Sequence, residues 1–334
     1  MEFTRASGKM ISWGIIGCGN VTEVKSGPAF NKVKDSRLTA VMRRDAGLAE
    51  DYAKRHNVPR FYSDASELIN DPGVNAVYVA TPPSSHATYA LMSIDAGKPV
   101  YIEKPMALNY EECLEINEAA ERKQVPVFVA YYRRALPGFV MVREMISSGK
   151  IGSVRSVHLQ LFKAPSPDEI SGRLSWRVDP AIAGGGHFFD LASHQLDYLD
   201  FLFGPVKEVK SYALNQGAWY KAEDYVSAGF MFDNNVTGTG IWCFNAHQSA
   251  GRDSIEIIGD KGYIRFSCFS FDPIIVENEA GKQEYINERP EHVQICLIGQ
   301  VVEALTKKIP AVSTGITAAR TSRVLEEMVK EYYK

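Results

Sequence analysis

The chain has 334 residues, of which 45% are hydrophobic and 23% charged, an ordinary composition for a globular protein. Its length predicts about two domains, each large enough to bury a core. A net charge of -3 provides no basic field and argues against nucleic acid as a partner. No apolar run approaches the roughly 18 residues that span a membrane, and the five scattered cysteines lack a C-x-x-C pair. We therefore expect a cytoplasmic protein with reduced thiols and no membrane partner.

Residues 1–9 show no periodicity, and Met10 is a natural start, so we expect 1–9 to be a vector-derived scar or a frayed tail. From residue 10 to 130, short β-branched runs alternate with helical patterns, which is typical of βαβ units and a parallel sheet. The predicted fold class is α/β, with a doubly wound Rossmann domain at 10–130. Strands are expected at 11–16, 38–42, 76–80, 100–102 and 127–130, and helices at 46–56 and 110–123, the latter capped by Asn109.

Residues 131–334 carry longer alternating segments, which predict an α+β domain with an open, mainly antiparallel sheet. Ile241, Trp242, Cys243 and Phe244 show little polar alternation, which is too apolar for a solvated sheet face. This run predicts a homo-oligomer, a dimer or tetramer, that covers the sheet. Expected elements are a helix at 139–148, strands at 154–162, 206–214, 225–232, 237–245 and 254–259, and a closing helix at 317–333.

The motif Gly17-x-Gly19 follows the first strand and opens a helix, which is the context of a dinucleotide-binding turn. Gly17 permits the tight turn, and Gly19 lets the backbone approach a pyrophosphate. Asn20 and Val21 begin the helix whose N-terminus would bind that group. Thr22 stands where the fingerprint prefers Gly or Ala, so the packing of helix on strand must accommodate a β-branched residue. Glycine turns also occur without a ligand, but the βαβ context favours cofactor binding.

Arg43 and Arg44 follow the second strand, where an NAD enzyme usually places an acid for the ribose 2′-hydroxyl. A guanidinium group offers forked donors to a 2′-phosphate, so the pair predicts NADP as the preferred cofactor over NAD. Two alternatives stay open. In the first, both arginines are solvated loop residues. In the second, the strand ends later than residue 42 and Asp45 binds the ribose.

The segment Thr81-Pro82-Pro83 follows the third expected strand, at the sheet edge where folds of this class bind ligands. The two prolines offer a rigid apolar wall to the cofactor. Hydroxyl groups in this loop and His86 are expected to bond its ribose or phosphates. The two serines before His86 are equally well explained as caps of the next helix.

Lys104, in Glu103-Lys104-Pro105, lies just past the fourth expected strand, on the same edge. A lysine in a turn is usually solvated, but this one is pinned before a proline where ligands bind. Three glycines at 184–186 precede a helix on which Asp190 and His194 share a face at i and i+4. Histidine transfers a proton in either direction near neutrality, and an ammonium group stabilises an alkoxide-like transition state. These residue types predict redox chemistry at an alcohol or carbonyl.

A metal site is the competing interpretation of the same helix. His187, Asp190, His194 and Asp197 fall at i, i+3, i+7 and i+10. Several ligands on one helix suit a di-metal bundle better than a mononuclear site, and the sequence offers no matching second cluster. We therefore predict that no metal is bound.

From Met10 onward the chain resembles the glucose–fructose oxidoreductase/inositol dehydrogenase/rhizopine-catabolism (Gfo/Idh/MocA) family in its G-x-G turn, its Glu-Lys-Pro motif and its Gly-Gly-Gly…Asp-x-x-x-His helix. The resemblance implies that Lys104, Asp190 and His194 are catalytic, and that Glu103 and Lys104 help to shape the nicotinamide pocket. It also implies association through the second sheet. Segments that flank the substrate pocket in relatives are similar to those containing Tyr131, Arg133, Trp176, Arg177 and His187. Interdomain packing explains the tyrosines at 131 and 132 equally well.

The function implied is hydride transfer between NADP, or NAD, and a hydroxyl or carbonyl group of a sugar or cyclitol-like small molecule. One alternative is a dihydrodiol or another cyclic non-sugar substrate. The other is a nucleotide-binding regulator without turnover. The intact Lys104, Asp190 and His194 argue against the regulator.

Overall fold

The computed structural model of the protein describes residues 10–334, so the expectation for residues 1–9 lies outside the described residues. The chain forms two compact units. The first contains the residues up to Ala135 together with Pro290–Ala319, and the second contains Leu136–Arg289 and Arg320–Lys334. The sequence predicted one boundary near residue 131, whereas 290–319 returns to the first unit. None of the described helices is long and apolar enough to cross a membrane.

The first unit contains a six-stranded parallel sheet in the order β3-β2-β1-β4-β5-β6, which is the predicted doubly wound arrangement. All of its strands except β3 were expected from the sequence. β3 is short and mostly exposed, so no buried face imposes an apolar pattern on it. The strands are β1 (Ile11–Ile16), β2 (Ser36–Met42), β3 (Arg60–Tyr62), β4 (Ala76–Val79), β5 (Val100–Ile102) and β6 (Val127–Val129).

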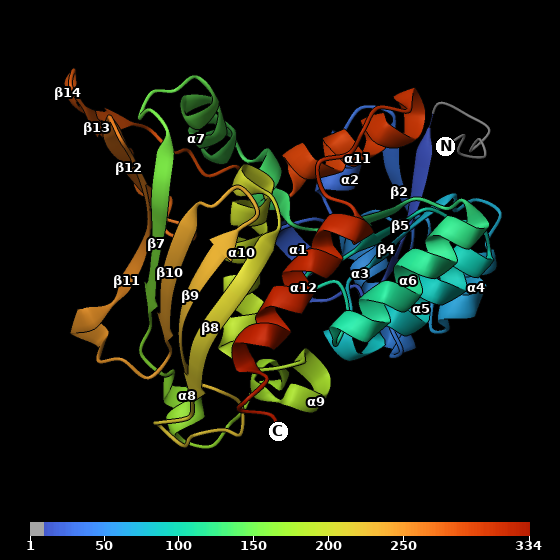
Figure 1. Cartoon of the computed structure of the whole chain (residues 1–334). Helices are drawn as coiled ribbons and strands as arrows, with labels where there is room; N and C mark the ends of the chain where they lie inside the picture. The colour runs from blue at the N-terminus through green and yellow to red at the C-terminus, as the bar shows by residue number, and fades with distance from the viewer. Residues whose placement is uncertain (1–9) are drawn as a thin grey trace. The chain divides into compact units, whose positions relative to one another are not determined.

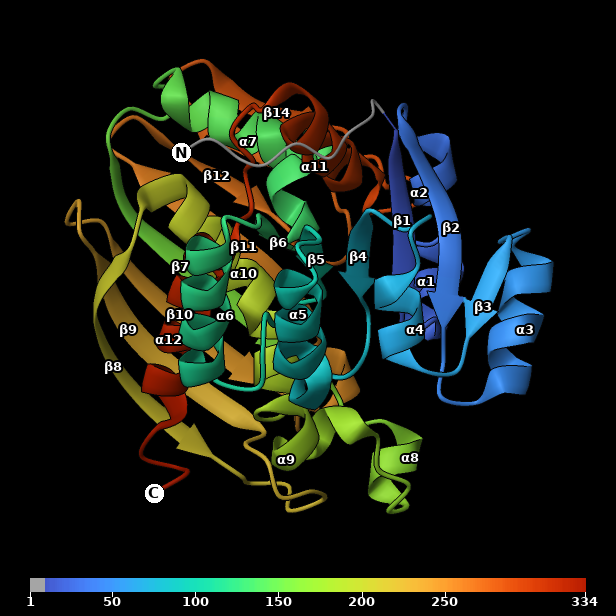
Figure 2. The same cartoon turned by 90° about the vertical axis from the view of Figure 1, so that its right-hand side faces the viewer.

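Helices cover one face of this sheet, as Figure 2 shows for α4 (Ala65–Asn70), α5 (His86–Asp95) and α6 (Tyr110–Lys123). Their apolar sides share a core with Val79, Ile102 and Val129. The Asn109 side chain caps α6 by accepting a hydrogen bond from the N–H of Glu112 (2.8 Å), which confirms the predicted helix start. The unit also contains α1 (Asn20–Val24), α2 (Ala29–Lys32), α3 (Ala46–Arg55), the 3-10 turns η1 (Pro83–Ser85) and η2 (Tyr132–Ala135), and α11 (Ile295–Lys307).

The opposite face of the sheet carries large aromatic side chains that need a cover. Trp13 and Tyr78 belong to this face, and the ring of Phe30 packs 4.9 Å from that of Trp13. The helix expected after β1 is interrupted, so α1 and α2 are too short to cover these rings alone. Helix α11 contacts β1 and α2 and lies beside α2 in Figure 1. Burial of this apolar face is therefore a physical reason for the return of 290–319 to the first unit.

The second unit contains an eight-stranded sheet in the order β14-β13-β12-β11-β7-β10-β9-β8. Neighbouring strands are antiparallel except β7 and β10, which pair in parallel, so the prediction of an open, mainly antiparallel sheet is confirmed. The strands are β7 (Val154–Phe162), β8 (Val206–Leu214), β9 (Tyr225–Phe232), β10 (Thr237–Cys243), β11 (Arg252–Gly259), β12 (Gly262–Phe266), β13 (Ile274–Asn278) and β14 (Gly281–Tyr285).

One long helix, α10 (His187–Phe203), runs along a face of this sheet (Figure 1). The ring of Phe188 packs 5.1 Å from that of Trp242, and the indole N–H of Trp242 donates to Gln195 Oε1 (2.7 Å). The remaining elements are α7 (Pro137–Ser147), α8 (Pro167–Ile170), η3 (Trp176–Val178), α9 (Pro180–Ala183) and η4 (Gln248–Ala250). Helix α12 (Gly315–Val329) begins in the first unit and continues in the second.

Strand β10 alternates between two faces, so the expectation of little polar alternation there is wrong. Trp242 is fully buried, whereas Thr237 and Thr239 lie on the other face and are exposed. Ile241 and Cys243 share that outer face and are half-buried. The run from Ile241 to Phe244 looked continuously apolar because, at this end of the strand, the residues on both faces are apolar. The open face of the sheet is therefore mixed rather than apolar.

A buried carboxyl group fixes the start of α10. The Oε1 atom of Glu223 accepts a hydrogen bond from the N–H of Gly186 (2.9 Å), and its Oε2 accepts one from the Tyr333 hydroxyl (2.5 Å). A Cβ atom at Gly186 would lie 2.7 Å from the carbonyl oxygen of Glu223, so this close approach requires glycine. Burial raises the pKa of Glu223 to about 7. The start of the helix that carries Asp190 is thus held by a hydrogen bond to a carboxyl group that can ionise near neutral pH.

Glu223→Gln should make the stability of the protein less dependent on pH. A carboxyl group whose pKa is raised by folding stabilises the fold fully below its unfolded value of 4.5, and this contribution is lost as the pH rises through about 7. Glutamine keeps the acceptor for Gly186 but cannot ionise. Between about pH 5 and about pH 8 the variant should gain on the order of 2–3 kcal/mol in unfolding free energy relative to wild type. Denaturant unfolding at the two pH values measures this gain.

The matched control is Glu279→Gln, at an exposed position of the same unit, which should leave the pH dependence unchanged. If the Glu223→Gln and wild-type free energies differ by the same amount at both pH values, Glu223 does not titrate in this range in the folded protein.

Candidate functional site

Strand β1 leads into a tight turn at the carboxyl edge of the first sheet. Gly17 has a φ of 91°, and its N–H and that of Cys18 donate to the carbonyl oxygen of Met42 (2.9 and 3.2 Å). A Cβ atom at Gly17 would lie 2.7 Å from the Thr81 side chain. A Cβ atom at Gly19 would meet nothing nearer than 3.9 Å. The fold itself therefore requires Gly17, whereas the backbone at Gly19 faces open space into which a ligand could fit.

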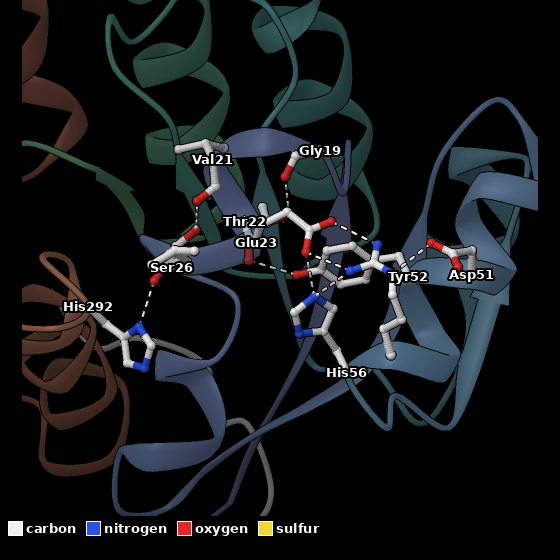
Figure 3. Close-up of polar contacts among 11 residues, drawn as sticks. Gly19, Val21, Thr22, Glu23, Ser26, Asp51, Tyr52, His56 and His292 are labelled. Atoms are coloured by element: carbon white, nitrogen blue, oxygen red, sulfur yellow. Dashed lines mark hydrogen bonds and ion pairs between the residues drawn. The ribbon is translucent and has the colours of Figure 1, made fainter.

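Thr22, at the third position of the fingerprint, is accommodated by hydrogen bonds (Figure 3). Its hydroxyl donates to the carbonyl oxygen of Gly19 (2.8 Å), and its own carbonyl oxygen accepts a hydrogen bond from the Tyr52 hydroxyl (2.8 Å). A Cβ atom at Gly27 would lie 2.3 Å from that tyrosine oxygen, so a glycine leaves room for the contact. These hydrogen bonds join Thr22 to the turn before α1 and to α3.

An ion-pair cluster also holds α3 beside α1 (Figure 3). The guanidinium of Arg55 contacts both carboxylate oxygens of Glu23 (2.8 and 2.9 Å), and His56 Nε2 lies 2.8 Å from Glu23 Oε2. The hydrogen bonds from Arg55 hold the pKa of Glu23 at about 2. Arg55 Nε also donates to Asp51 (2.7 Å). Arg55 is thus engaged within the protein and is a poor candidate for binding a cofactor phosphate.

Arg43 and Arg44 are exposed directly after β2 and form no ion pair within residues 10–334. Arg43 directly follows Met42, whose carbonyl oxygen accepts hydrogen bonds from the N–H groups of Gly17 and Cys18, so the backbone of Arg43 lies beside the Gly17 turn. The Asp45 side chain caps α3 by accepting a hydrogen bond from the N–H of Leu48 (3.0 Å). The two arginines are therefore better placed than Asp45 to meet a cofactor.

The loop after β4 is stabilised from within. The Ser85 hydroxyl contacts the Thr81 hydroxyl (2.8 Å) and does not cap α5. His86 is fully buried, with Nε2 2.7 Å from the carbonyl oxygen of Thr81 and Nδ1 3.0 Å from that of Pro105. Burial lowers the pKa of His86, and a neutral imidazole donates to only one of these oxygens at a time. His86 braces this loop against the segment after Lys104, which favours a structural role over direct cofactor contact.

Glu103 is buried beside Lys104 and accepts hydrogen bonds from three donors. Its Oε1 accepts from the Tyr78 hydroxyl and from Gln294 Nε2 (2.6 Å), and its Oε2 accepts from the backbone N–H of Lys104 (3.2 Å). The Tyr101 hydroxyl donates to Gln294 Oε1 (2.9 Å) and so fixes the orientation of the amide. Burial raises the pKa of both tyrosines well above the usual range, which keeps them donors. Glu103 thus fixes the backbone from which the Lys104 side chain projects.

Asp190 and His194 lie on one face of α10, as predicted. Asp190 Oδ2 lies 3.6 Å from Arg177 Nε, and His194 is buried with its ring 6.2 Å from that of Phe269. The fully buried Asp197 accepts a hydrogen bond from the Thr321 hydroxyl (3.4 Å). In residues 10–334 no three His, Cys, Asp or Glu side chains cluster as metal ligands would. The geometry of this face gives the metal interpretation no support.

The segments expected to flank a substrate are divided between the two units. Tyr131 and Arg133 are buried in the first unit, where the Arg133 guanidinium lies 4.9 Å from the centroid of the Tyr132 ring. In the second unit the Arg177 guanidinium lies 4.5 Å from the centroid of the Trp176 ring. Stacking on an aromatic ring orients each guanidinium group.

Sequence reasoning missed three polar side chains that hold the functional segments: Gln294, Glu223 and Glu169. Gln294 carries no local signal, because its partner Glu103 lies 191 positions away. For Glu169 a local signal existed, since Ser166 and Glu169 have the spacing of a capping box, and the structure contains that box. The spacing predicts a helix start but not the contact of Glu169 with His187 (2.5 Å).

Comparison with known proteins assigns both units to known domain families. Residues 11–131 match the family described as "Oxidoreductase family, NAD-binding Rossmann fold", and residues 139–265 match "GFO/IDH/MocA C-terminal domain". An oxidoreductase of Formosa agariphila is 43% identical over 87% of this chain and 90% of its own length. Trans-1,2-dihydrobenzene-1,2-diol dehydrogenase of Bos taurus is 26% identical over 80% of this chain and 78% of its own length.

A levoglucosan dehydrogenase of Pseudarthrobacter phenanthrenivorans is 33% identical over 66% of this chain and 62% of its own length. A solved levoglucosan dehydrogenase structure, in complex with NADH, has the same fold, with a TM-score of 0.89 at 22% identity over 97% of each chain. With both family domains matched and a relative 43% identical over most of its length, the chain belongs to the Gfo/Idh/MocA oxidoreductase family and carries its NAD-binding Rossmann domain.

Proposed function

We propose that this oxidoreductase prefers NADP and transfers hydride between the nicotinamide and a CH–OH carbon of a sugar or cyclitol. The observation that carries the proposal is the shared face of α10, where Asp190 and His194 lie four residues apart, the spacing on which the family resemblance rests. Lys104 supports it, because it follows β5 at the carboxyl edge of the nucleotide-binding sheet. A sugar-type substrate is supported by the relative named levoglucosan dehydrogenase.

The cofactor would lie along the carboxyl edge of the first sheet. Gly19, Asn20 and Val21 fit the pyrophosphate, because the backbone there has room and α1 begins at this point. Arg43 and Arg44 fit the 2′-phosphate of NADP. The remaining proposed contacts are Gly17, Thr81, Pro82, Pro83 and the Lys104 segment, with Glu103 acting through the Lys104 backbone and His86 through the loop that it braces.

The bound nicotinamide supplies the hydride acceptor or donor, and the chain supplies the proton chemistry. His194 takes the hydroxyl proton during oxidation and returns it during reduction, because an imidazole exchanges a proton near neutrality. The Lys104 ammonium stabilises the developing negative charge on the same oxygen. Asp190, beside Arg177, orients the substrate or the imidazole.

A dihydrodiol is the second candidate substrate, favoured by several relatives named trans-1,2-dihydrobenzene-1,2-diol dehydrogenase. Nicotinamide absorbance in a panel of sugars, inositols and diols, each with both cofactors, separates the two. The same panel tests whether the protein has any turnover, since a nucleotide-binding regulator would bind cofactor and convert none of the compounds.

Arg43→Asp should narrow or reverse the preference for NADPH over NADH. The substitution replaces a charge-assisted pair to the 2′-phosphate, worth about 1.5–3 kcal/mol, which corresponds to a factor of about ten or more in Kd. Fluorescence titration with both reduced cofactors measures the two affinities. Lys34→Asp makes the same charge change at the amino end of β2 and should leave the ratio unchanged. Equal wild-type affinities for the two cofactors would rule out the phosphate contact.

Lys104→Ala and His194→Ala should each lower turnover about 10²-fold or more, because acid–base assistance is typically worth 10² to 10⁴. The affinity for NADPH should stay within a few-fold, since neither side chain is proposed to bind the phosphates. His194→Ala should also flatten the pH dependence of turnover near neutrality. His247→Ala, at an exposed position of the second unit, is the matched control. Wild-type turnover and pH profile in His194→Ala would remove His194 from the mechanism.

The outer face of the second sheet is proposed to pack against another copy of the chain. Tyr212 and Leu214, on β8, are 77% and 44% exposed, and the half-buried Ile241 lies on the same face two strands away, on β10. Ile241→Glu should shift the protein toward monomers in light scattering at micromolar concentration, because a charge would be buried in the interface. Ile309→Glu, at an exposed position of the first unit, should not. A wild-type protein that is already monomeric at this concentration contradicts the proposal.

A further inference from the structure

Glu169 and His187 form a pair at the beginning of the functional face of α10. His187 Nε2 lies 2.5 Å from Glu169 Oε1. His187, Asp190 and His194 fall at i, i+3 and i+7 and therefore share this face. The Glu169 side chain is 8% exposed and that of His187 is 23% exposed, so a buried acid supports an accessible imidazole.

The second carboxylate oxygen of Glu169 is held by the capping box of α8. Its Oε2 accepts hydrogen bonds from the backbone N–H of Ser166 (2.7 Å) and from the Ser166 hydroxyl (2.9 Å). Burial opposes ionisation, but the hydrogen bonds from Ser166 and His187 outweigh it and lower the pKa of Glu169. The ionised carboxylate accepts the proton on His187 Nε2. In the neutral imidazole the other nitrogen, Nδ1, therefore carries a lone pair and can only accept a hydrogen bond.

The surroundings of His187 are aromatic. Its ring centroid lies 5.4 Å from that of Phe244 and 5.8 Å from that of Tyr220. Its Nδ1 atom has no hydrogen-bond partner in the described part of the chain. The Tyr220 side chain is buried, and its hydroxyl likewise has no partner among residues 10–334. A fixed acceptor beside aromatic rings suits a ligand that presents both a hydroxyl group and an apolar ring face.

We propose that His187, oriented by Glu169, accepts a hydrogen bond from a second hydroxyl group of the substrate. The proposal rests on the proposed function and deepens it, because it assigns one residue to a hydroxyl group of the substrate other than the one that reacts. Along the helix axis His187 stands about 4.5 Å before Asp190, a span that one six-membered ring with its hydroxyl groups covers. His187 is thus a substrate-positioning residue, distinct from the proton carrier His194.

The competing explanation is that the pair only joins α8 to α10. The two explanations differ in what they predict for ligand binding. A structural contact would change stability, whereas a positioning contact changes the affinity for the polyol and leaves that for the cofactor unchanged.

Binding to the complex with NADPH tests the proposal without turnover, because a polyol cannot be oxidised while the cofactor is reduced. Saturation-transfer NMR with levoglucosan, methyl α-D-glucopyranoside and myo-inositol, none of which carries a carbonyl group that NADPH could reduce, compares wild type, His187→Phe and His187→Gln. His187→Phe keeps the aromatic packing and removes the acceptor, and should weaken polyol binding about tenfold. His187→Gln keeps an acceptor oxygen and should remain within about threefold of wild type. His247→Phe is the matched control at an exposed site.

Glu169→Gln provides a second variant in case His187→Phe does not fold. It frees the imidazole proton to sit on either nitrogen, so binding should weaken less than in His187→Phe. Unchanged polyol affinity in a folded His187→Phe protein, or the absence of binding by any of the three polyols to wild type, overturns the proposal. The turnover panel is judged separately. If polyol binding is weaker in His187→Phe than in wild type but wild type turns over none of the compounds, the polyol site stands and the proposed reaction is rejected.

Discussion

A buried carboxyl group must be met by hydrogen-bond donors, and the donors to Glu103 come from the next residue and from two distant parts of the sequence. Tyr78 belongs to β4, Lys104 follows directly, and Gln294 begins the segment that leads into α11. Leaving such a group unsatisfied costs more than an average hydrogen bond contributes. The Glu-Lys-Pro segment, the neighbouring strand and the returning segment are therefore tied to one another by a single side chain.

The returning segment also holds the end of the dinucleotide helix. His292 Nδ1 lies 2.6 Å from the carbonyl oxygen of Val24, and the N–H of Gln294 donates to the carbonyl oxygen of Lys25 (3.3 Å). These carbonyls close α1, whose first turn is proposed to face the pyrophosphate. One short stretch, 292–294, thus links the proposed phosphate site to the backbone of Lys104. A disturbance there is expected to affect the proposed contacts with both the pyrophosphate and the nicotinamide.

Most strands could be predicted because their patterns are local. β1, β7, β8 and β9 have the bounds that alternation or a continuous apolar run indicates. The parallel pairing of β7 with β10 could not be predicted, since it depends on the partners and not on either strand. The same holds for the return of 290–319, whose cause is an aromatic sheet face that short helices leave uncovered. Alternation in β10 was misjudged because Gly238 and Gly240 occupy its inner face without adding apolar side chains.

For the candidate site, too, the sequence indicated the residues that lie in local motifs but not the residues that hold them in place. Residues with a motif around them, such as Gly17, Lys104 and His194, could be selected as candidates from the sequence, and the family resemblance implied the catalytic roles of Lys104 and His194. The side chains that hold them, Glu223 and Gln294, carry no spacing signal, because a hydrogen bond over a long sequence distance leaves no local pattern. Asp45 shows the intermediate case. Its position suited either a ribose ligand or a helix cap, and the bond to Leu48 favours the cap.

Helix α10 is fixed at its start, middle and end, which is the support that a precise site needs. Glu223 binds the N–H of Gly186 before its first turn, and Gln195 accepts the indole N–H of Trp242 at its centre. Near its end, Asp200 accepts two hydrogen bonds from Arg320 Nε and Nη2 (2.9 and 2.6 Å). All three acceptors are buried, so each break would leave an unsatisfied polar group. The face that carries His187, Asp190 and His194 is consequently held in one orientation before any substrate binds, which reduces the entropy lost on binding.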